Sequence, residues 1–316
     1  MRFAWVGFHA EGIPALEALL AAQAPIAAVL TLTPEMRAKR AAGADYRPVC
    51  DRYGVPMHEV ADINSDEARS TLASIQPDVV FVIGWHQILR GETLRLARIG
   101  MVGAHASLLP HNRGSAPINW SIIRGDSRTG NSLIWLAEDV DSGDIIDQTE
   151  FPITPYDTCA TLYEKVAASN RGMLLRLVPR LMAGERPGRK QSLIDVPVNA
   201  RRRPKDGLVD WSQPSRNIYD FIRALTRPYP GAFSTLDGQT WKIWQAALAP
   251  AKCAPEARPG ELVGPVVSPV SAACGQLVAC GEGALILLEV EGPDGTILRG
   301  RPLGDQPWAG KRWTHA

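Results

Sequence analysis

His105 stands alone between an apolar run and a polar loop in the segment GMVGAHASLLPHNRG, residues 100–114. Downstream, the segment DVDSGDI supplies three carboxylates, those of Asp139, Asp141 and Asp144. A carboxylate beside a histidine orients the ring and stabilises its protonated form, so the pair is common in acid–base catalysis. The pattern favours a His–Asp site without selecting among the aspartates. The alternatives are a structural histidine and, with less support, a metal site, because no second histidine lies nearby at ligand spacing.

Two loops are predicted to border the same site. WHQ, residues 85–87, follows the apolar segment PDVVFVIG, and HNRG, residues 111–114, precedes a predicted helix start near Pro117. Ligands of open α/β sheets bind beyond the carboxyl ends of the strands, and helix N-termini attract anions and polar groups. We therefore predict ligand contacts from both loops, because Trp85 is too costly to expose without a partner. The alternative for WHQ is a surface loop with an exposed aromatic ring.

Three other motifs favour structural interpretations. In VGFHAEG, Gly7 and Gly12 do not have the spacing of a dinucleotide-binding loop, so a structural turn is expected. RPYPGAF, residues 227–233, is typical of a helix stop followed by a rigid turn. RRRPK, residues 201–205, has the charge to contact phosphate or a tRNA backbone, but a solvated linker is the favoured interpretation.

The first half of the chain alternates between strand-like and helix-like segments. The predicted strands lie at 2–8, 25–32, 55–60, 77–84, 101–106, 131–137 and 143–153. The predicted helices lie at 11–23, 43–53, 62–76, 92–100, from about 116, and at 157–184. Asn64 or Ser65 is expected to cap the third of these, with Glu67 in its first turn. This rhythm predicts an α/β fold with a Rossmann-like, mostly parallel sheet covered by helices on both faces.

A change of composition marks the end of this predicted domain. Residues 185–206 are rich in Arg, Lys, Pro and Gly, which is typical of a linker. Beyond them, one helix is predicted at 215–227, followed by short strands with Gly and Pro between them. We predict a Rossmann-like catalytic domain over 1–190, a basic linker over 191–206, and a small OB-like β-barrel domain over 207–316.

Composition and charge narrow the classes of function. The 316 residues are 45% hydrophobic and 21% charged, with a formal net charge of +1, so global charge favours neither nucleic acid nor an anionic membrane. The sequence predicts no membrane span and no signal peptide. The five cysteines are scattered and form no CxxC motif, as expected for thiols in a reducing cytoplasm. We therefore expect a cytoplasmic protein.

The segment HASLLPHNRGSAPINW (105–120), followed by DVDSGDII (139–146), resembles the active-site signature of the folate-dependent formyltransferases. That signature reads roughly Asn-x-His-x-Ser-Leu-Leu-Pro-x-x-Arg-Gly, then Asp-x-Gly. RRRPKDGLVDW and IRALTRPYPGAF are similar to the start of the C-terminal domain in the tRNA and nucleotide-sugar branches, and APINW is most similar to the nucleotide-sugar branch. The resemblance covers the whole chain, and it is specific because a long motif, an aspartate and a second domain coincide.

The resemblance implies the formyltransferase fold, with 10-formyltetrahydrofolate as formyl donor and no metal. In the family, an acceptor amine attacks the formyl carbon, the asparagine and histidine hold the oxyanion, and the aspartate holds the histidine. The motif places the histidine at His105 and the aspartate at Asp141, the latter selected by motif position alone. Folate-binding residues are expected at Ile83, Gly84, Trp85, His86, Gln87, Ile88 and Asp139. Substrate-binding residues are expected at Ser107, Leu108, Pro110, Asn112, Arg113 and Gly114.

One position departs from the family pattern. The asparagine of the signature falls on Gly103, which has no side chain. Removing one oxyanion donor typically slows acyl transfer by about 10²–10³-fold. Three explanations are open. In the first, the freed space admits a larger acyl group or a differently placed substrate. In the second, the chemistry has been lost. In the third, another donor replaces the asparagine amide, and the candidates are Asn112, Asn131, Gln87, His86 and a water molecule.

We therefore predict transfer of a formyl or related one-carbon group to a primary amine of a small molecule, with His105, Asp141 and Gly103 in the catalytic site. A nucleotide-linked amino sugar fits APINW best, and a siderophore or secondary-metabolite amine is another candidate. A tRNA acceptor is less favoured, because it would require a basic channel. The alternatives are hydrolysis of the formyl donor or another C–N acyl chemistry, and a non-catalytic folate-binding relative. The sequence does not indicate an oligomeric state.

Overall fold

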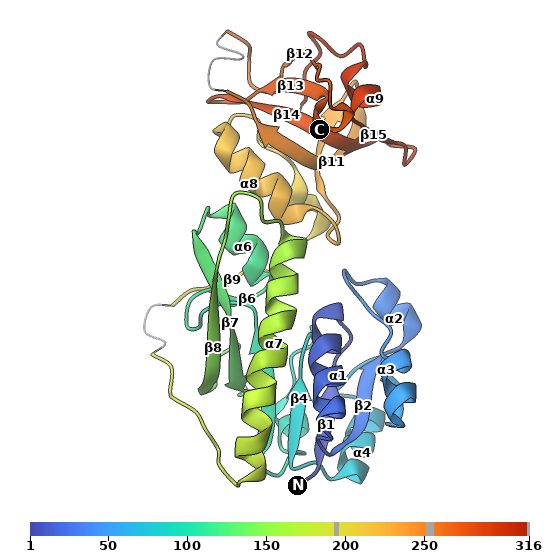
Figure 1. Cartoon of the computed structure of the whole chain (residues 1–316), viewed down its shortest axis with the longest axis vertical. Coiled ribbons are helices and arrows are strands. Elements are labelled where there is room, and N and C mark those ends of the chain that lie inside the picture. Colours follow the sequence, from blue (N-terminus) through green and yellow to red (C-terminus); the bar gives the residue numbers. More distant parts are fainter. Residues whose placement is uncertain (193–195, 251–255, 315–316) are drawn as a thin grey trace. The chain divides into compact units, whose positions relative to one another are not determined.

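The computed structural model describes residues 1–192, 196–250 and 256–314 and forms two compact units (Figure 1). The first unit comprises Met1–Ile118, Ser127–Ile153 and Thr161–Arg201. The second comprises Asn119–Asp126, Thr154–Ala160 and the chain from Arg202 onward. Each unit is therefore assembled from segments that are distant in sequence. No helix in these described ranges is long and apolar enough to cross a membrane.

A seven-stranded sheet forms the centre of the first unit, in the order β3-β2-β1-β4-β5-β7-β8. Its strands are β1 (Phe3–Val6), β2 (Ile26–Leu32), β3 (Met57–Val60), β4 (Val79–Val82), β5 (Gly100–His105), β7 (Arg128–Trp135) and β8 (Ile145–Pro152). β1 to β5 pair in parallel, whereas β7 is antiparallel to both β5 and β8. The predicted mostly parallel sheet is confirmed. Its strand order reverses between β1 and β4, which is where open α/β sheets bind ligands.

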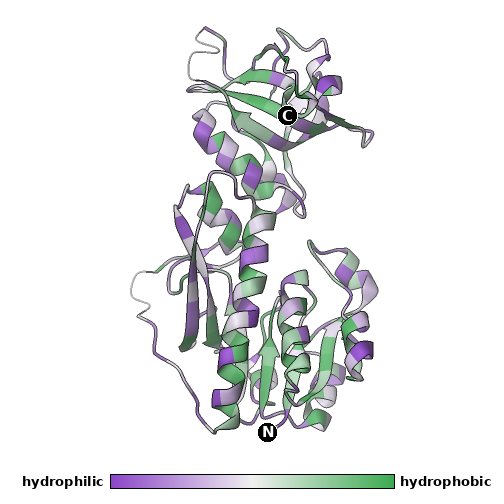
Figure 2. Ribbon diagram, in the orientation of Figure 1, coloured by the Kyte–Doolittle hydropathy of each residue, from purple (hydrophilic) through white to green (hydrophobic). Residues whose placement is uncertain are grey.

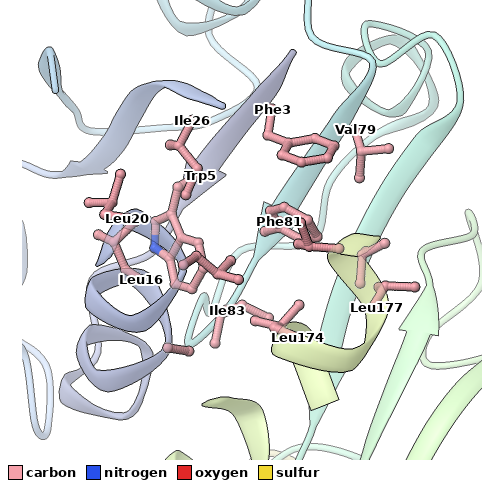
Figure 3. Close-up of a cluster of buried hydrophobic side chains, with 14 of the residues drawn as sticks. Phe3, Trp5, Leu16, Leu20, Ile26, Val79, Phe81, Ile83, Leu174 and Leu177 are labelled. Atoms are coloured by element: carbon pink, nitrogen blue, oxygen red, sulfur yellow. The ribbon is translucent and has the colours of Figure 1, made fainter. Parts of the chain in front are cut away.

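Helices cover both faces of this sheet. They include α1 (Ile13–Ala21), α2 (Pro34–Ala38), α3 (Arg47–Tyr53), α4 (Asp66–Ile75), α5 (Gly91–Leu94) and α7 (Cys159–Met182). On one face, Leu16 of α1 and Leu174 of α7 pack with Trp5 and Phe81 of the sheet (Figure 3). On the other face, Leu72 of α4 belongs to a separate buried cluster. Strands covered on both faces have apolar residues at successive positions, and β4 is coloured hydrophobic along its length (Figure 2).

The local signals in the sequence explain most helix boundaries. α4 begins after Ser65, whose Oγ accepts a hydrogen bond from the N–H of Ala68, as predicted. α5 is shorter than the helix expected over 92–100, because the N–H groups of Arg98 and Ile99 donate instead to the carbonyl oxygens of residues 77 and 78. α2 was not predicted, since five residues are too few to establish a helical period.

The second unit contains an antiparallel sheet in the order β10-β11-β14-β13-β12, with β15 also paired to β14. Its strands are β10 (Ala232–Leu236), β11 (Gln239–Leu248), β12 (Leu262–Val266), β13 (Gly275–Ala279), β14 (Ala284–Glu291) and β15 (Ile297–Arg299). Its helices include α8 (Ser215–Leu225) and α9 (Arg301–Gly304), and most of α6 (Pro117–Ile123) belongs to it. Near the C-terminus, Thr314 bridges Thr235 of β10 and Arg312 bridges Glu261 beside β12, so one segment joins both sheet edges. The predicted C-terminal antiparallel β domain is confirmed.

Candidate active site

His105 is the last residue of β5, at the edge of the sheet where the parallel strands end. Its Nδ1 lies 3.4 Å from Oδ2 of Asp141, and its side chain is 9% exposed. Its Nε2 lies 2.8 Å from the backbone carbonyl oxygen of Asn112. Because a carbonyl oxygen only accepts hydrogen bonds, Nε2 carries a proton and donates a hydrogen bond to the backbone carbonyl oxygen of Asn112. Both ring nitrogens therefore face oxygen atoms, Nδ1 the carboxylate of Asp141 and Nε2 the backbone carbonyl of Asn112.

Asp141 is held in place from several directions. Its Oδ2 accepts a hydrogen bond from the N–H of Gly114 at 2.8 Å. Its backbone carbonyl oxygen accepts one from Nε2 of Gln191 at 2.9 Å. Its φ of +50° lies in the left-handed region, which aspartate tolerates better than most residues. Of the three aspartates considered from the sequence, Asp141 is the one in contact with His105, whereas Asp139 is exposed.

Two side chains of the loop after His105 make hydrogen bonds that stabilise it. Oγ of Ser107 donates to the carbonyl oxygen of His111 at 2.7 Å, and Nε of Arg113 donates to the carbonyl oxygen of Val140 at 3.0 Å. Ser107 and Arg113, both expected to contact substrate, therefore fix the two loops that carry His105 and Asp141. Leu109, between Leu108 and Pro110 of the expected substrate set, is 3% exposed.

Two polar residues that the sequence did not single out support these two loops: Gln191 the one that carries Asp141, and Asn199 the one that carries Asn112. Asn199 lies in β9 (Val198–Asn199), which pairs in parallel with β6 (Arg113–Gly114), and its Nδ2 donates to Oδ1 of Asn112 at 3.3 Å. Gln191 holds the backbone on both sides of Ser142 through the carbonyl oxygens of Asp141 and Gly143. Both lie in the segment for which a linker was expected, and no local signal in that segment indicates such contacts.

The loop at 83–88 presents aromatic rings next to the end of β1. The rings of Trp85 and His86 contact the ring of Phe8 edge to face, at centroid distances of 5.9 and 5.1 Å. Gly84 has a φ of +65°, and its carbonyl oxygen accepts hydrogen bonds from the N–H groups of residues 8 and 9. Burial lowers the pKa of His86 to about 4, and the positive charges of Arg40 and Arg201 act in the same direction. His86 is therefore a neutral ring at physiological pH.

Gln87 and Ile88 of the same loop differ in their exposure and bonding. The side-chain amide of Gln87 accepts from the N–H of Ile63 at 2.9 Å and donates to the carbonyl oxygen of Ala61 at 2.8 Å. Ile88 is 68% exposed, and Ile83 is fully buried in the core. Gln87 was considered as a replacement for the missing asparagine amide, but its own amide is hydrogen-bonded to the backbone of residues 61 and 63. Asn131 is engaged too, donating from Nδ2 to Ser169 and Asn170.

A buried acid lies in the β1–α1 loop beside Gly84. Nδ1 of His9 accepts a hydrogen bond from the N–H of Glu11, so this nitrogen is unprotonated, and it lies 3.5 Å from Oε2 of Glu11. Oε2 of Glu11 is buried and has no hydrogen-bond partner in the described part of the chain. Burial accordingly raises the pKa of Glu11 to about 7 and lowers the pKa of His9 to about 4.

We predict that Glu11→Gln changes how stability depends on pH. The unfolded chain loses the Glu11 proton near pH 4.5 and the folded chain near pH 7, so the parent loses stability as pH rises through that interval. Glutamine cannot ionise, so the free energy of unfolding of the variant, relative to the parent, should rise by about 3 kcal/mol between pH 5 and pH 8. Urea unfolding at several pH values measures this difference. Parallel profiles for the two proteins would contradict the assignment.

Two family models match the chain. The model described as "Formyl transferase" matches residues 15–178, and the model described as "Formyl transferase, C-terminal domain" matches residues 202–304. The first match contains the whole region from Trp85 to Asp141, and the second covers most of the second unit.

Several solved structures share the fold. HypX from Aquifex aeolicus, in complex with tetrahydrofolic acid, is 16% identical with a TM-score of 0.65, and the match covers 100% of this chain and 51% of that one. The N-formyltransferase from Helicobacter canadensis, in complex with folinic acid and dTDP-3-aminofucose, is 16% identical with a TM-score of 0.64, covering 91% and 98%. WlaRD, a sugar 3N-formyl transferase solved in the presence of dTDP and 5-N-formyl-THF, is 17% identical with a TM-score of 0.62, covering 90% and 96%. The chain spans about half the length of the HypX structures it matches.

Proposed function

Because the chain belongs to the formyl transferase family, we propose that it transfers a formyl group from 10-formyltetrahydrofolate to a primary amine of a nucleotide-linked amino sugar. The observation that carries this proposal is the position of His105 at the end of β5, with Asp141 on one ring nitrogen and a proton on the other. The acceptor class is supported by the APINW segment and by the likeness to the Helicobacter canadensis and WlaRD structures.

In this proposal His105 is the proton-bearing donor to the transferring group. As the amine nitrogen bonds to the formyl carbon, negative charge develops on the formyl oxygen, and a donor aimed at that oxygen lowers the barrier. Nε2–H can serve once it exchanges its hydrogen bond from the carbonyl oxygen of Asn112 to the substrate. When the bond to the folate nitrogen breaks, that nitrogen gains one proton and the amine loses one. No net proton is therefore consumed.

Asp141 orients His105 during that exchange. Its carboxylate oxygen Oδ2 lies 3.4 Å from Nδ1, so the ring stays oriented while Nε2 changes its hydrogen-bond partner. The N–H of Gly114 donates to the same oxygen, Oδ2, at 2.8 Å, and so keeps the carboxylate in place beside the ring. We assign Asp141 the role of fixing the orientation of the His105 ring.

The loop at 83–88 is the proposed site for the folate ring system. A flat heteroaromatic ring is stabilised by aromatic faces and edges, which the cluster of Phe8, Trp85 and His86 supplies. His86, neutral because of burial, adds one hydrogen-bond donor or acceptor without a charge. Asp139, exposed on the loop before Asp141, is proposed as a further polar contact to folate.

The donor site is tested by titrating the protein with 5-formyltetrahydrofolate. We expect saturable binding in the micromolar range, and about tenfold weaker binding by Trp85→Ala, because one aromatic contact is lost. Trp85→Phe keeps an aromatic ring and should bind nearly as tightly as the parent. Calorimetry with all three proteins measures these constants, and thermal unfolding checks that each variant is folded. Absence of binding by the parent at millimolar ligand would refute the donor assignment.

A further inference from the structure

The side chain of Leu136 lies where a side chain on Gly103 would begin. A Cβ built on Gly103 would lie 2.4 Å from Cδ2, 3.1 Å from Cγ and 3.5 Å from Cδ1 of Leu136, and these are its three nearest heavy atoms. Gly103 lies within β5, between Val82 and Ile134, in extended backbone that any residue can adopt. A side chain at position 103 would therefore require the side chain of Leu136 to move, whereas the backbone itself permits it.

Leu136 is itself well anchored. It follows β7, and its N–H donates to the carbonyl oxygen of Met101 at 2.7 Å. Its side chain packs against two clusters of buried residues, one that includes Val82 and one formed by Leu109, Ile134 and Ile145. The leucine thus occupies a defined apolar position and does not leave an empty space.

Residues 103 and 105 lie two apart on one strand, so they face the same side of the sheet, about 7 Å apart. The branched end of Leu136 consequently lies over the residue next to His105 on that face. An apolar group there donates no hydrogen bond, yet it excludes water, and water exclusion strengthens the remaining polar contacts. The freed space that was one of the three explanations for Gly103 is therefore occupied in this structure.

We propose that Gly103 and Leu136 form a single unit of the active-site wall, in which Leu136 supplies an apolar surface beside His105 at the position where a side chain on residue 103 would otherwise lie. The expected effect of this pair on kcat rests on the proposed formyl transfer. The packing of Leu136 at the Cβ position of residue 103 does not depend on which reaction the protein catalyses. It predicts that the two positions must be changed together.

A double-mutant cycle with Gly103→Asn and Leu136→Ala tests the packing relation. Gly103→Asn alone overpacks the site and Leu136→Ala alone leaves a cavity, so each should lower the urea midpoint. The double variant should recover part of that loss, because the asparagine enters the space that the leucine leaves. If the two losses simply add, Leu136 is not the counterpart of Gly103 and the proposal is wrong.

The role of this apolar surface in the reaction is tested by comparing kcat of two double variants, Gly103→Asn/Leu136→Ala and Gly103→Ala/Leu136→Ala. The second variant fills part of the space but offers no hydrogen-bond donor. For formyl transfer, we expect kcat of the asparagine double variant to exceed that of the alanine one by about 10²-fold, with KM little changed, because the added hydrogen bond acts in the transition state. Equal kcat values would overturn the role of the pair in the reaction. A third outcome is that the effects of the two substitutions on the urea midpoint do not add, while neither the parent nor any variant transfers a formyl group. That result would refute the proposed function and would still support the packing of Leu136 against position 103.

Discussion

Replacing His105 by alanine should lower kcat/KM for formyl transfer by about 10²–10⁴-fold, because the substitution removes the proton-bearing donor at the end of β5. The fold should persist, since the ring makes its two contacts at the edge of the sheet, with Asn112 and Asp141. Initial rates measured with saturating folate donor, and circular dichroism of the same preparation, check both statements. Binding of 5-formyltetrahydrofolate should change little, because the proposed folate contacts come from the loop at 83–88.

The matched control for this substitution is His58→Ala, at an exposed histidine in β3. It removes the same group from the same sheet, away from the carboxyl end of β5, and should leave kcat/KM near the parent value. A His105→Ala protein that retains its fold and more than a tenth of the parent activity would contradict the role assigned to His105. It would favour a mechanism in which His105 is a structural histidine.

Asp141→Asn should lower kcat by about 10³-fold with a smaller change in KM, because the variant loses the negative charge that lies beside His105 when the ring donates to the developing oxyanion. The amide keeps the size of the carboxylate, and its oxygen can still accept from the N–H of Gly114. The loss is therefore expected in the chemical step and not in the fold. Steady-state kinetics together with urea unfolding separate the two.

Glu138→Gln provides the control for charge in the same loop. Glu138 is 71% exposed and its carboxylate lies 3.5 Å from Arg95, a surface ion pair that contributes little. Its neutralisation should leave both kcat and KM within about twofold of the parent. An equal loss in Glu138→Gln and Asp141→Asn would show that general loop charge matters, and that the contact between Asp141 and His105 does not.

The fold could be predicted from the sequence to the extent that local patterns determine it. Continuous apolar runs such as 77–84 identify strands covered on both faces, and Ser65 identifies a helix start, because these signals depend on nearby residues. The short strands predicted after the helix at 215–227 begin only at residue 239, so β10 was not among them, because it begins directly after the turn at Gly231, whose φ is +97°, and only five residues follow. The closure of the C-terminal sheet by Thr314 and Arg312 depends on pairing between distant segments, which periodicity does not indicate.

The site was predictable only in part, because some of its contacts depend on the paths of loops and on the packing of residues that are distant in sequence. The spacing of His105 and the aspartates, together with strand ends meeting at one sheet edge, indicated a His–Asp contact, and motif position pointed to Asp141. The carbonyl oxygen of Asn112 on Nε2 could not be predicted, because it follows from the backbone path of a loop. Nor could Leu136 over Gly103, since that contact depends on side-chain packing at atomic distances.

The central claim, that this chain moves a formyl group from folate to an amine, is tested most directly by measuring both products of one reaction. The protein is incubated with 10-formyltetrahydrofolate and a nucleotide-linked amino sugar, and tetrahydrofolate and N-formyl sugar are quantified by mass spectrometry over time. We expect the two products to appear in equal amounts, at a rate that falls sharply in His105→Ala. Release of tetrahydrofolate without a formylated amine would show hydrolysis of the donor, and would contradict the claim.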